Sequence, residues 1–267
     1  MQIYDAIIIG GGHNGLVTGA YLAKAGKTVL ILERRSTLGG IAATEEIFPG
    51  FKYPTCAHLA GMFSQEIIAE LELKKHGLEI LPLDPLLFVP ALEREPFLLP
   101  RQQPEIADAI GRHSRADAEK ILSFSALVKK LNAFLQSLYH LPLPDGRDSG
   151  RWYLPELMKL GWKFHRLGER EMYELLRILP MSVADWLSEW FESDVLKAAL
   201  AAGGLLSSFV GPRAQGTALG FLYHLLGEST GAFRTSGFVR GGIGNLPQAI
   251  ASAAQGFGAK IQLGAEA

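Results

Sequence analysis

The sequence contains a single cysteine, Cys56, among its 267 residues. An internal disulfide, a CxxC redox pair and a cysteine-rich metal site each need at least two cysteines, so none of them can form within this chain. We therefore expect reducing surroundings, no metal site, and a buried, small apolar role for Cys56.

An excess of charge of either sign is also absent. The chain has 26 Lys and Arg against 27 Asp and Glu, which gives a formal net charge of -1. Binding to nucleic acid depends on a basic face, whereas the charges here are balanced and interspersed. The composition therefore excludes nucleic acid as an expected partner.

No hydrophobic run is long enough to span a membrane as a helix. The longest nearly apolar stretch, residues 198–211, is short and contains Gly203, Gly204, Ser207 and Ser208. The N-terminus enters a strand pattern within three residues and lacks the basic, apolar and small-residue order of a secretory signal. These features predict a cytoplasmic protein, and they leave peripheral contact with a membrane surface open.

Glycine, by contrast, is plentiful, and its most informative cluster lies near the N-terminus. Gly10, Gly12 and Gly15 form a GxGxxG motif between an apolar run at residues 3–9 and a helical pattern that Gly26 ends. The three glycines permit a tight turn, close approach of the backbone to a pyrophosphate, and close helix–strand contact. The N–H groups at the helix start attract phosphate, so the motif predicts a dinucleotide cradle.

The residues inside and after this motif complete the predicted cradle. His13 and Asn14 lie in the loop, where we expect His13 to be a loop side chain and not an acid or base. Glu33 ends a second apolar run, and a carboxylate there can accept both hydroxyls of a ribose. An acid argues against a 2′-phosphate, although the adjacent Arg34 and Arg35 could pair with one. NAD and FAD both satisfy these residues.

The chain's periodicity predicts an α/β fold with a helical insertion. Residues 3–33 read as a βαβ unit whose first strand, nearly all apolar, is expected to be buried on both faces. A helix at 246–255 and a strand at 260–263 return to this pattern near the end. We therefore predict a Rossmann-like domain from residues 1–72 and 232–267, with a largely helical lobe at 73–231 between them.

Five observations describe the predicted lobe and its flanks. Residues 39–61 are expected to be irregular but ordered, and prolines limit residues 78–100 to short strands. Apolar residues that recur every three or four positions form one face of a predicted helix, which we expect to be buried in the hydrophobic core. They are Ile121, Phe124, Leu127, Val128, Leu131, Phe134, Leu135 and Leu138. Ser182 and Asp185 have the spacing of a capping box. Carboxylates at 169, 171 and 174 are expected to be solvated.

The stretch ERRSTLGGIAAT, residues 33–44, resembles the signature of Glu, five residues and Gly-Gly in the FAD-binding superfamily that includes amine oxidases and phytoene desaturases. In that superfamily the Gly-Gly turn lies beside the flavin side of the dinucleotide. The resemblance therefore implies flavin or pyrophosphate contacts for Gly39, Gly40, Ile41 and Ala42, and it favours FAD as the cofactor.

Two further stretches, FPGFKYPTCAHLAGMF and GFVRGGIGNLPQAI, resemble the phytoene dehydrogenase and carotenoid isomerase-related branch of that superfamily. The resemblance covers the first 60 and last 30 residues, and the middle only in its helical character. It implies that Arg240, Gly241 and Gly242 approach the isoalloxazine, although a loop before a helix explains this Gly-Gly equally well. His58 becomes the one weak catalytic candidate, since a lone histidine is more often structural.

The resemblance implies a GR2-type FAD-dependent oxidoreductase. Its expected substrate is a hydrophobic polyene or lipid, altered at a carbon–carbon bond by desaturation, saturation or isomerisation. Two alternatives stay open: a flavin amine oxidase, and a non-catalytic flavin-binding interaction protein. Relatives in this family continue for about as long again, so we expect an N-terminal portion, a truncated product or half of a split protein. Alone, such a chain should retain FAD weakly and expose an apolar face.

Overall fold

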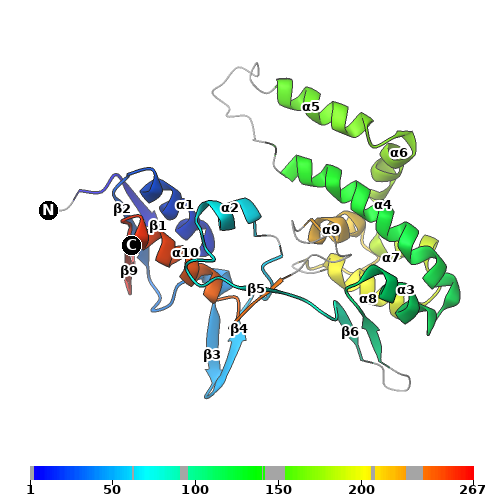
Figure 1. Cartoon of the computed structure of the whole chain (residues 1–267), viewed down its shortest axis with the longest axis horizontal. Coiled ribbons are helices and arrows are strands. Elements are labelled where there is room, and N and C mark those ends of the chain that lie inside the picture. The colour runs from blue at the N-terminus through cyan, green and yellow to red at the C-terminus, as the bar shows by residue number, and fades with distance from the viewer. Residues whose placement is uncertain are drawn as a thin grey trace. The chain divides into compact units, whose positions relative to one another are not determined.

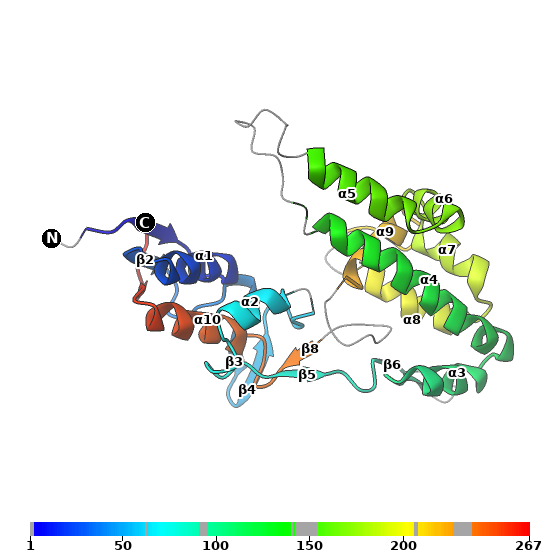
Figure 2. The ribbon, with the colours of Figure 1, turned by 45° about the horizontal axis from the view of Figure 1, so that its top comes forward.

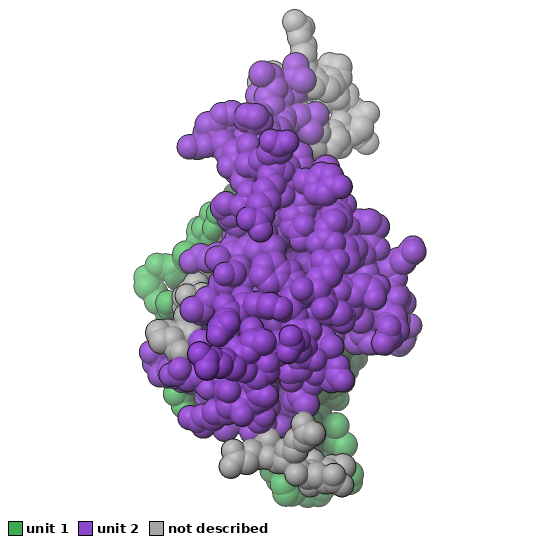
Figure 3. All heavy atoms as spheres, turned by 90° about the vertical axis from the view of Figure 1, so that its right-hand side faces the viewer, with its two compact units in different colours: residues 1–83, 227–229, 236–267 green, residues 84–226, 230–235 purple. Residues whose placement is uncertain are grey.

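The computed structural model describes residues 3–61, 63–90, 96–139, 141, 154–205, 208–226 and 237–267. The chain forms two compact units, which are coloured separately in Figure 3. Unit 1 comprises residues 1–83, 227–229 and 236–267, and unit 2 comprises residues 84–226 and 230–235. Within the part of the chain that is described, no helix has the length and apolar character of a membrane span.

Unit 1 is built on a parallel three-stranded sheet in the order β1–β2–β9. Its strands are β1 (Ala6–Ile9), β2 (Val29–Glu33) and β9 (Lys260–Leu263). Helix α1 (His13–Lys24) joins β1 to β2, and α10 (Asn245–Gly256) leads into β9. Figures 1 and 2 show α1 and α10 side by side. This is a Rossmann-like nucleotide-binding fold, and the predicted α/β class is confirmed.

The expectation that the first strand is buried on both faces is wrong. Ile8 packs into the core under α1, whereas Ile7 is 58% and Ile9 74% exposed. The physical reason is position: β1 pairs only with β2 among the described strands, and it lies at the sheet edge. The central strand β2 is the one whose apolar side chains are buried, with Val29 and Ile31 inside the core.

The rest of unit 1 contains more regular structure than the sequence predicts. Residues 39–61 include a 3₁₀ turn (Gly40–Ala42) and a hairpin of β3 (Thr44–Phe48) and β4 (Phe51–Pro54). Gly50, with φ +85°, makes the hairpin turn that a residue with a Cβ would strain. Cys56, expected to be buried, is exposed because it follows this solvent-facing hairpin.

The boundary of unit 1 lies later than predicted. The sequence predicts its first part to end at residue 72, whereas residues 73–83 belong to it. Strand β5 (Ile80–Pro82) pairs antiparallel with β8 (Gly237–Val239), which ties this segment to the late part of the chain. Helix α2 (Gln65–Glu70) precedes it.

Unit 2 is a helical cluster with a small hairpin. Its elements are β6 (Leu87–Val89), β7 (Phe97–Leu99), α3 (Gln103–Gly111), α4 (Arg115–Tyr139), α5 (Leu154–His165), α6 (Glu169–Ile178), α7 (Val183–Trp190), α8 (Asp194–Leu205) and α9 (Thr217–His224). The aromatic centre is Phe124, whose ring lies 5.1–6.3 Å from those of Trp186, Trp190, Phe191 and Phe221.

The predicted features of unit 2 are largely confirmed. In α4 the expected core stripe is buried from Ile121 to Leu135 apart from the half-buried Leu127, and its last member, Leu138, is 40% exposed. The capping box is present, since the Asp185 N–H donates to Ser182 Oγ at 3.0 Å at the start of α7. The strands expected within residues 78–100 form β5, β6 and β7.

Candidate cofactor site

Helix α1 packs closely on the loop that precedes it and on the strands because three glycines, one in the loop and two in α1, leave no room for a side chain or have a left-handed backbone. Gly10 has φ +103°. A Cβ on Gly15 would lie 2.3 Å from the Gly10 carbonyl oxygen, and one on Gly19 would lie 2.5 Å from Ile31 Cδ1. The glycines therefore set α1 directly against the ends of β1 and β2, the geometry that the motif predicts.

Glu33, at the end of β2, holds this loop in place. Its side chain is 7% exposed, and its Oε2 accepts the Gly11 N–H at 2.7 Å. Its Oε1 accepts the Arg35 N–H at 2.9 Å. A carboxylate has about four acceptor directions, so two remain after these bonds. Glu33 thus lies beside the glycine loop, while its predicted role on a ribose stays a prediction.

The Gly-Gly turn lies against the same loop. The Gly39 N–H donates to the Gly11 carbonyl at 2.9 Å, and Gly39 forms an isolated parallel bridge with Gly12. Gly39 and Gly40 have φ of +123° and +58°. A Cβ on Gly39 would lie 2.9 Å from the Ala42 carbonyl oxygen, and one on Gly40 would lie 3.3 Å from Gly12 Cα, so this turn depends on glycine. Of the other two residues predicted here, Ala42 is buried and Ile41 is 58% exposed.

The late Gly-Gly segment joins the site through Thr44, a residue to which the sequence assigns no role. The Gly244 N–H donates to Thr44 Oγ1 at 2.9 Å. A Cβ on Gly242 would lie 2.7 Å from the same oxygen, and Gly241 and Gly242 both have positive φ. The loop at 240–244 therefore packs on the segment that follows the Gly-Gly turn. The only sequence signal was position, because Thr44 ends the ERRSTLGGIAAT stretch.

Arg240 lies at the start of this late loop and is held by an acid of unit 1. Its Nε contacts Glu79 Oε2 at 2.5 Å, and its side chain is 64% exposed. The hydrogen bond and charge of Glu79 raise the pKa of the Arg240 guanidinium above its usual range. The Arg240 carbonyl accepts from Asn245 Nδ2 at 2.7 Å, which closes the loop onto the first residue of α10.

The remaining predicted residues lie around the loop. Asn14 and Arg34 are exposed, and Arg35 forms an ion pair with Glu45 of β3. His58 is exposed, four residues after the hairpin ends. Nδ1 of His13 is buried without a hydrogen-bond partner among the described residues. A buried polar atom of this kind costs about 1–3 kcal/mol until a partner satisfies it.

These features fit a dinucleotide. No side chain caps the start of α1, its first turn carries no acid, and its N-cap is Gly12. The first-turn amides and the helix dipole therefore favour an anion there. His13 adds an unsatisfied polar atom in the same turn. The described residues contain no group of three His, Cys, Asp or Glu that could hold a metal ion.

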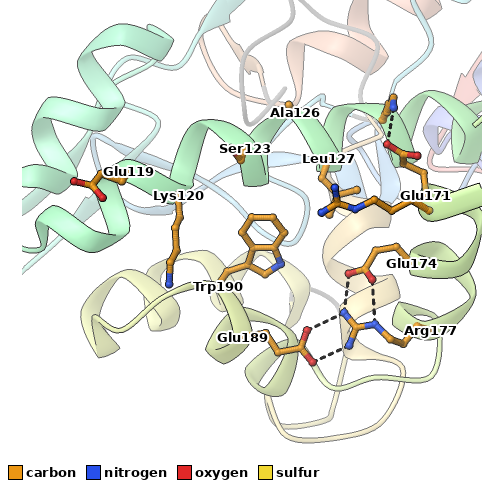
Figure 4. A pocket seen from close by; sticks show the side chains of 12 residues that line it. Glu119, Lys120, Ser123, Ala126, Leu127, Glu171, Glu174, Arg177, Glu189 and Trp190 are labelled. Atoms are coloured by element: carbon orange, nitrogen blue, oxygen red, sulfur yellow. Dashed lines mark hydrogen bonds and ion pairs between the residues drawn. The ribbon is translucent and has the colours of Figure 1, made fainter. Parts of the chain in front are cut away.

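Unit 2 contains a surface cleft of about 880 Å³ between α4, α6 and α7. Figure 4 shows Arg177 between Glu174 and Glu189, bonded to both. Glu171 pairs with Lys130 at 2.6 Å. The expectation of solvated carboxylates holds for the exposed Glu169. It is wrong for Glu171 and Glu174, which are ion-paired and only 20% and 21% exposed. The opposite charges neutralise one another, so the cleft is not nominated as a catalytic site.

Comparison with known proteins agrees with this geometry. Residues 8–71 match the NAD(P)-binding Rossmann-like domain family. The chain is 33% identical to rat pyridine nucleotide-disulfide oxidoreductase domain-containing protein 2 over 271 aligned residues, which cover 97% of this chain and 47% of that protein. It is 30% identical to a subunit of limonene dehydrogenase from Castellaniella defragrans over 176 residues, covering 64% of this chain and 31% of that one.

A solved structure of a putrescine oxidase triple mutant shares the fold, with a TM-score of 0.55 and 16% identity over 98% of this chain and 51% of that one. The chain thus spans about half the length of the relatives it matches most fully. Residues 8–71 are therefore an NAD(P)-binding Rossmann-like domain, and the chain shares its fold with the solved oxidase structure.

Proposed function

We propose that this chain is the dinucleotide-binding and helical part of an FAD-dependent oxidoreductase that acts on a carbon–carbon bond of a hydrophobic substrate. The reaction would be a desaturation, a saturation or a redox-neutral isomerisation of a terpene, polyene or lipid. The observation that carries the proposal is the meeting of Gly12, Glu33, Gly39 and the Thr44-bound late loop at one end of the parallel sheet.

One feature favours FAD over NAD, and another argues against NADP. The glycine loop and Glu33 suit either cofactor, but the Gly39–Gly40 turn and the loop at 240–244 extend the site beyond one mononucleotide cradle. Glu33, buried and bonded to amides, would repel a 2′-phosphate on a ribose next to it, which argues against NADP. When bound, a flavin supplies the redox chemistry through its isoalloxazine.

The residues of this chain then bind and orient the cofactor. Amides at the start of α1 would face the pyrophosphate, and Glu33 would accept ribose hydroxyls through its remaining acceptor directions. Thr44 holds the loop at 240–244 on the segment after the Gly-Gly turn.

The substrate class rests on a relative and on side-chain chemistry. The matching limonene dehydrogenase chain is named for an apolar terpene, and the match covers 64% of the present chain. Unit 2 is rich in leucine and aromatic side chains, and burying an apolar substrate against such groups is favourable in proportion to the area removed from water.

The test is cofactor and product analysis of the purified protein. We expect a flavin absorbance spectrum, FAD released on denaturation and identified by mass spectrometry, and oxidation or isomerisation of terpene or polyene substrates followed by gas chromatography. Matched assays with primary amines and peroxide detection test the amine oxidase alternative. Tight binding of NAD without FAD would contradict the cofactor assignment. Bound FAD that no candidate donor reduces would favour a non-catalytic flavin-binding protein.

A further inference from the structure

Helix α5 of unit 2 carries a row of large apolar side chains that no described residue covers. The row consists of Leu154, Met158 and Trp162, which are 58%, 68% and 58% exposed. Their spacing of four places them on one face of the helix, and we call this face the α5 stripe. No residue of α5 is fully buried.

The α5 stripe is not the face that attaches the helix to unit 2. Leu160 and Phe164 are half-buried on another side, and the Phe164 ring lies 5.3 Å from Phe134 of α4. Lys163 Nζ donates to Ser137 of α4 at 3.2 Å. Figures 1 and 2 both show α5 running along the outside of α4. The helix is therefore held by one side while the α5 stripe faces away from it.

Cationic side chains lie beside the α5 stripe, on the polar side of helix α5. Lys159 and Arg166 lie along this side, and the one carboxylate of α5 is Glu156. Glu156 Oε1 is already paired with Lys159 Nζ at 2.6 Å. The Arg166 guanidinium lies 4.3 Å from the centre of the Trp162 ring, which joins the cationic border to the apolar face.

This combination matches a helix that lies in a bilayer interface. Such helices present Leu and Trp on one face and Lys or Arg beside it, with the indole at headgroup level. Twelve residues give α5 a length of about 18 Å, which is short of the ~30 Å hydrocarbon core, so the helix cannot span. Anionic headgroups complement the cations, whereas a second copy of α5 would offer only one carboxylate, already paired.

We propose that unit 2 docks on the surface of a membrane containing anionic lipids through the α5 stripe, with Lys159 and Arg166 at the headgroups. The proposal does not depend on the cofactor assignment, because it rests on α5 alone.

The experiment is flotation of the whole protein with vesicles of phosphatidylcholine alone and with added phosphatidylserine. We expect at least tenfold more protein on the anionic vesicles and a loss of binding as salt rises. Met158→Glu and Trp162→Ser should each lower the bound fraction at least fivefold. The matched control is Tyr173→Ser, which changes an aromatic side chain that is 72% exposed on α6, outside the stripe, and should stay within twofold.

A second measurement keeps the proposal testable if a variant folds poorly. Lipids brominated near the headgroup should quench tryptophan fluorescence of the native protein, and Trp162→Phe should remove most of that quenching with an unchanged circular dichroism spectrum. Absence of binding by folded protein, or equal losses in the stripe and control variants, would overturn the proposal. A dimer in solution that Met158→Glu abolishes, without vesicle binding, would instead assign the stripe to a second copy.

Discussion

The carboxylate of Glu33 accepts the backbone N–H of Gly11 at 2.7 Å, so the residue that ends β2 holds the loop that begins α1. The two residues are 22 positions apart and come from opposite ends of the βαβ unit. The same carboxylate also accepts the Arg35 N–H. Glu33 is thus both part of the predicted cofactor site and a structural tie, and its replacement should affect folding even without cofactor.

Glu33→Gln tests this double role. The variant keeps the side-chain volume but loses the charge and one acceptor oxygen, so we expect a loss of about 1–3 kcal/mol in unfolding free energy. Affinity for FAD should also fall, because fewer acceptors remain for a ribose. The measurements are urea unfolding and FAD titration. Glu45→Gln, which removes an exposed ion pair with Arg35, should cost less than about 1 kcal/mol.

Gly15→Ala should distort the glycine loop. The added Cβ would lie 2.3 Å from the Gly10 carbonyl oxygen, which is a backbone atom and cannot rotate away. We expect the free energy of unfolding to fall by about 1–3 kcal/mol, which would be measured as a lower unfolding midpoint. The control is Gly161→Ala in α5, where no atom lies within 4 Å of the new Cβ. That change should be neutral or slightly stabilising, because alanine favours a helix.

Thr44→Val should loosen the late loop without changing the shape of the site. The variant removes the oxygen that accepts the Gly244 N–H at 2.9 Å, and the expected loss is about 0.5–1.5 kcal/mol. Thr44→Ser should restore stability and FAD affinity, since it keeps the hydroxyl. Thr55→Val is the matched control, because its hydroxyl makes only a long contact of 3.4 Å with the Ala43 carbonyl. Equal effects of the two valine variants would contradict the role of Thr44.

The parts of this site that the sequence predicts are those encoded by neighbouring residues. The GxGxxG loop, the acid at position 33 and the late helix and strand follow from local spacing and periodicity, and the structure has them. The role of Thr44 depends on a partner 200 positions away, so no local pattern indicates it. The exposure of Ile7 and Ile9 depends on which strands lie beside β1, and periodicity alone cannot report this.

Alkaline pH should weaken unit 1 through Tyr21. Burial, followed by its 2.5 Å hydrogen bond to Glu70, raises the pKa of Tyr21 to about 12, against 10.0 for the unperturbed phenol. The unfolded chain therefore loses this proton first as pH rises. Stability contributed by Tyr21 is complete below about pH 10 and declines as pH rises from there through about 12. Tyr21→Phe should flatten that decline in urea unfolding.

Asp117 supplies the last prediction, and it concerns unit 2. Its side chain is fully buried, and its two oxygens accept the Glu192 and Ser193 N–H groups at 2.7 and 2.9 Å. The bonds join the first turn of α4 to the turn between α7 and α8. Asn has one acceptor oxygen, so in Asp117→Asn one of the two backbone N–H groups faces an amide NH₂. The free energy of unfolding should therefore fall by about 1–3 kcal/mol. Asp108→Asn on the exposed face of α3 is the control and should change the unfolding midpoint little. If both variants unfold at the native midpoint, the Asp117 bonds do not stabilise the helix junction.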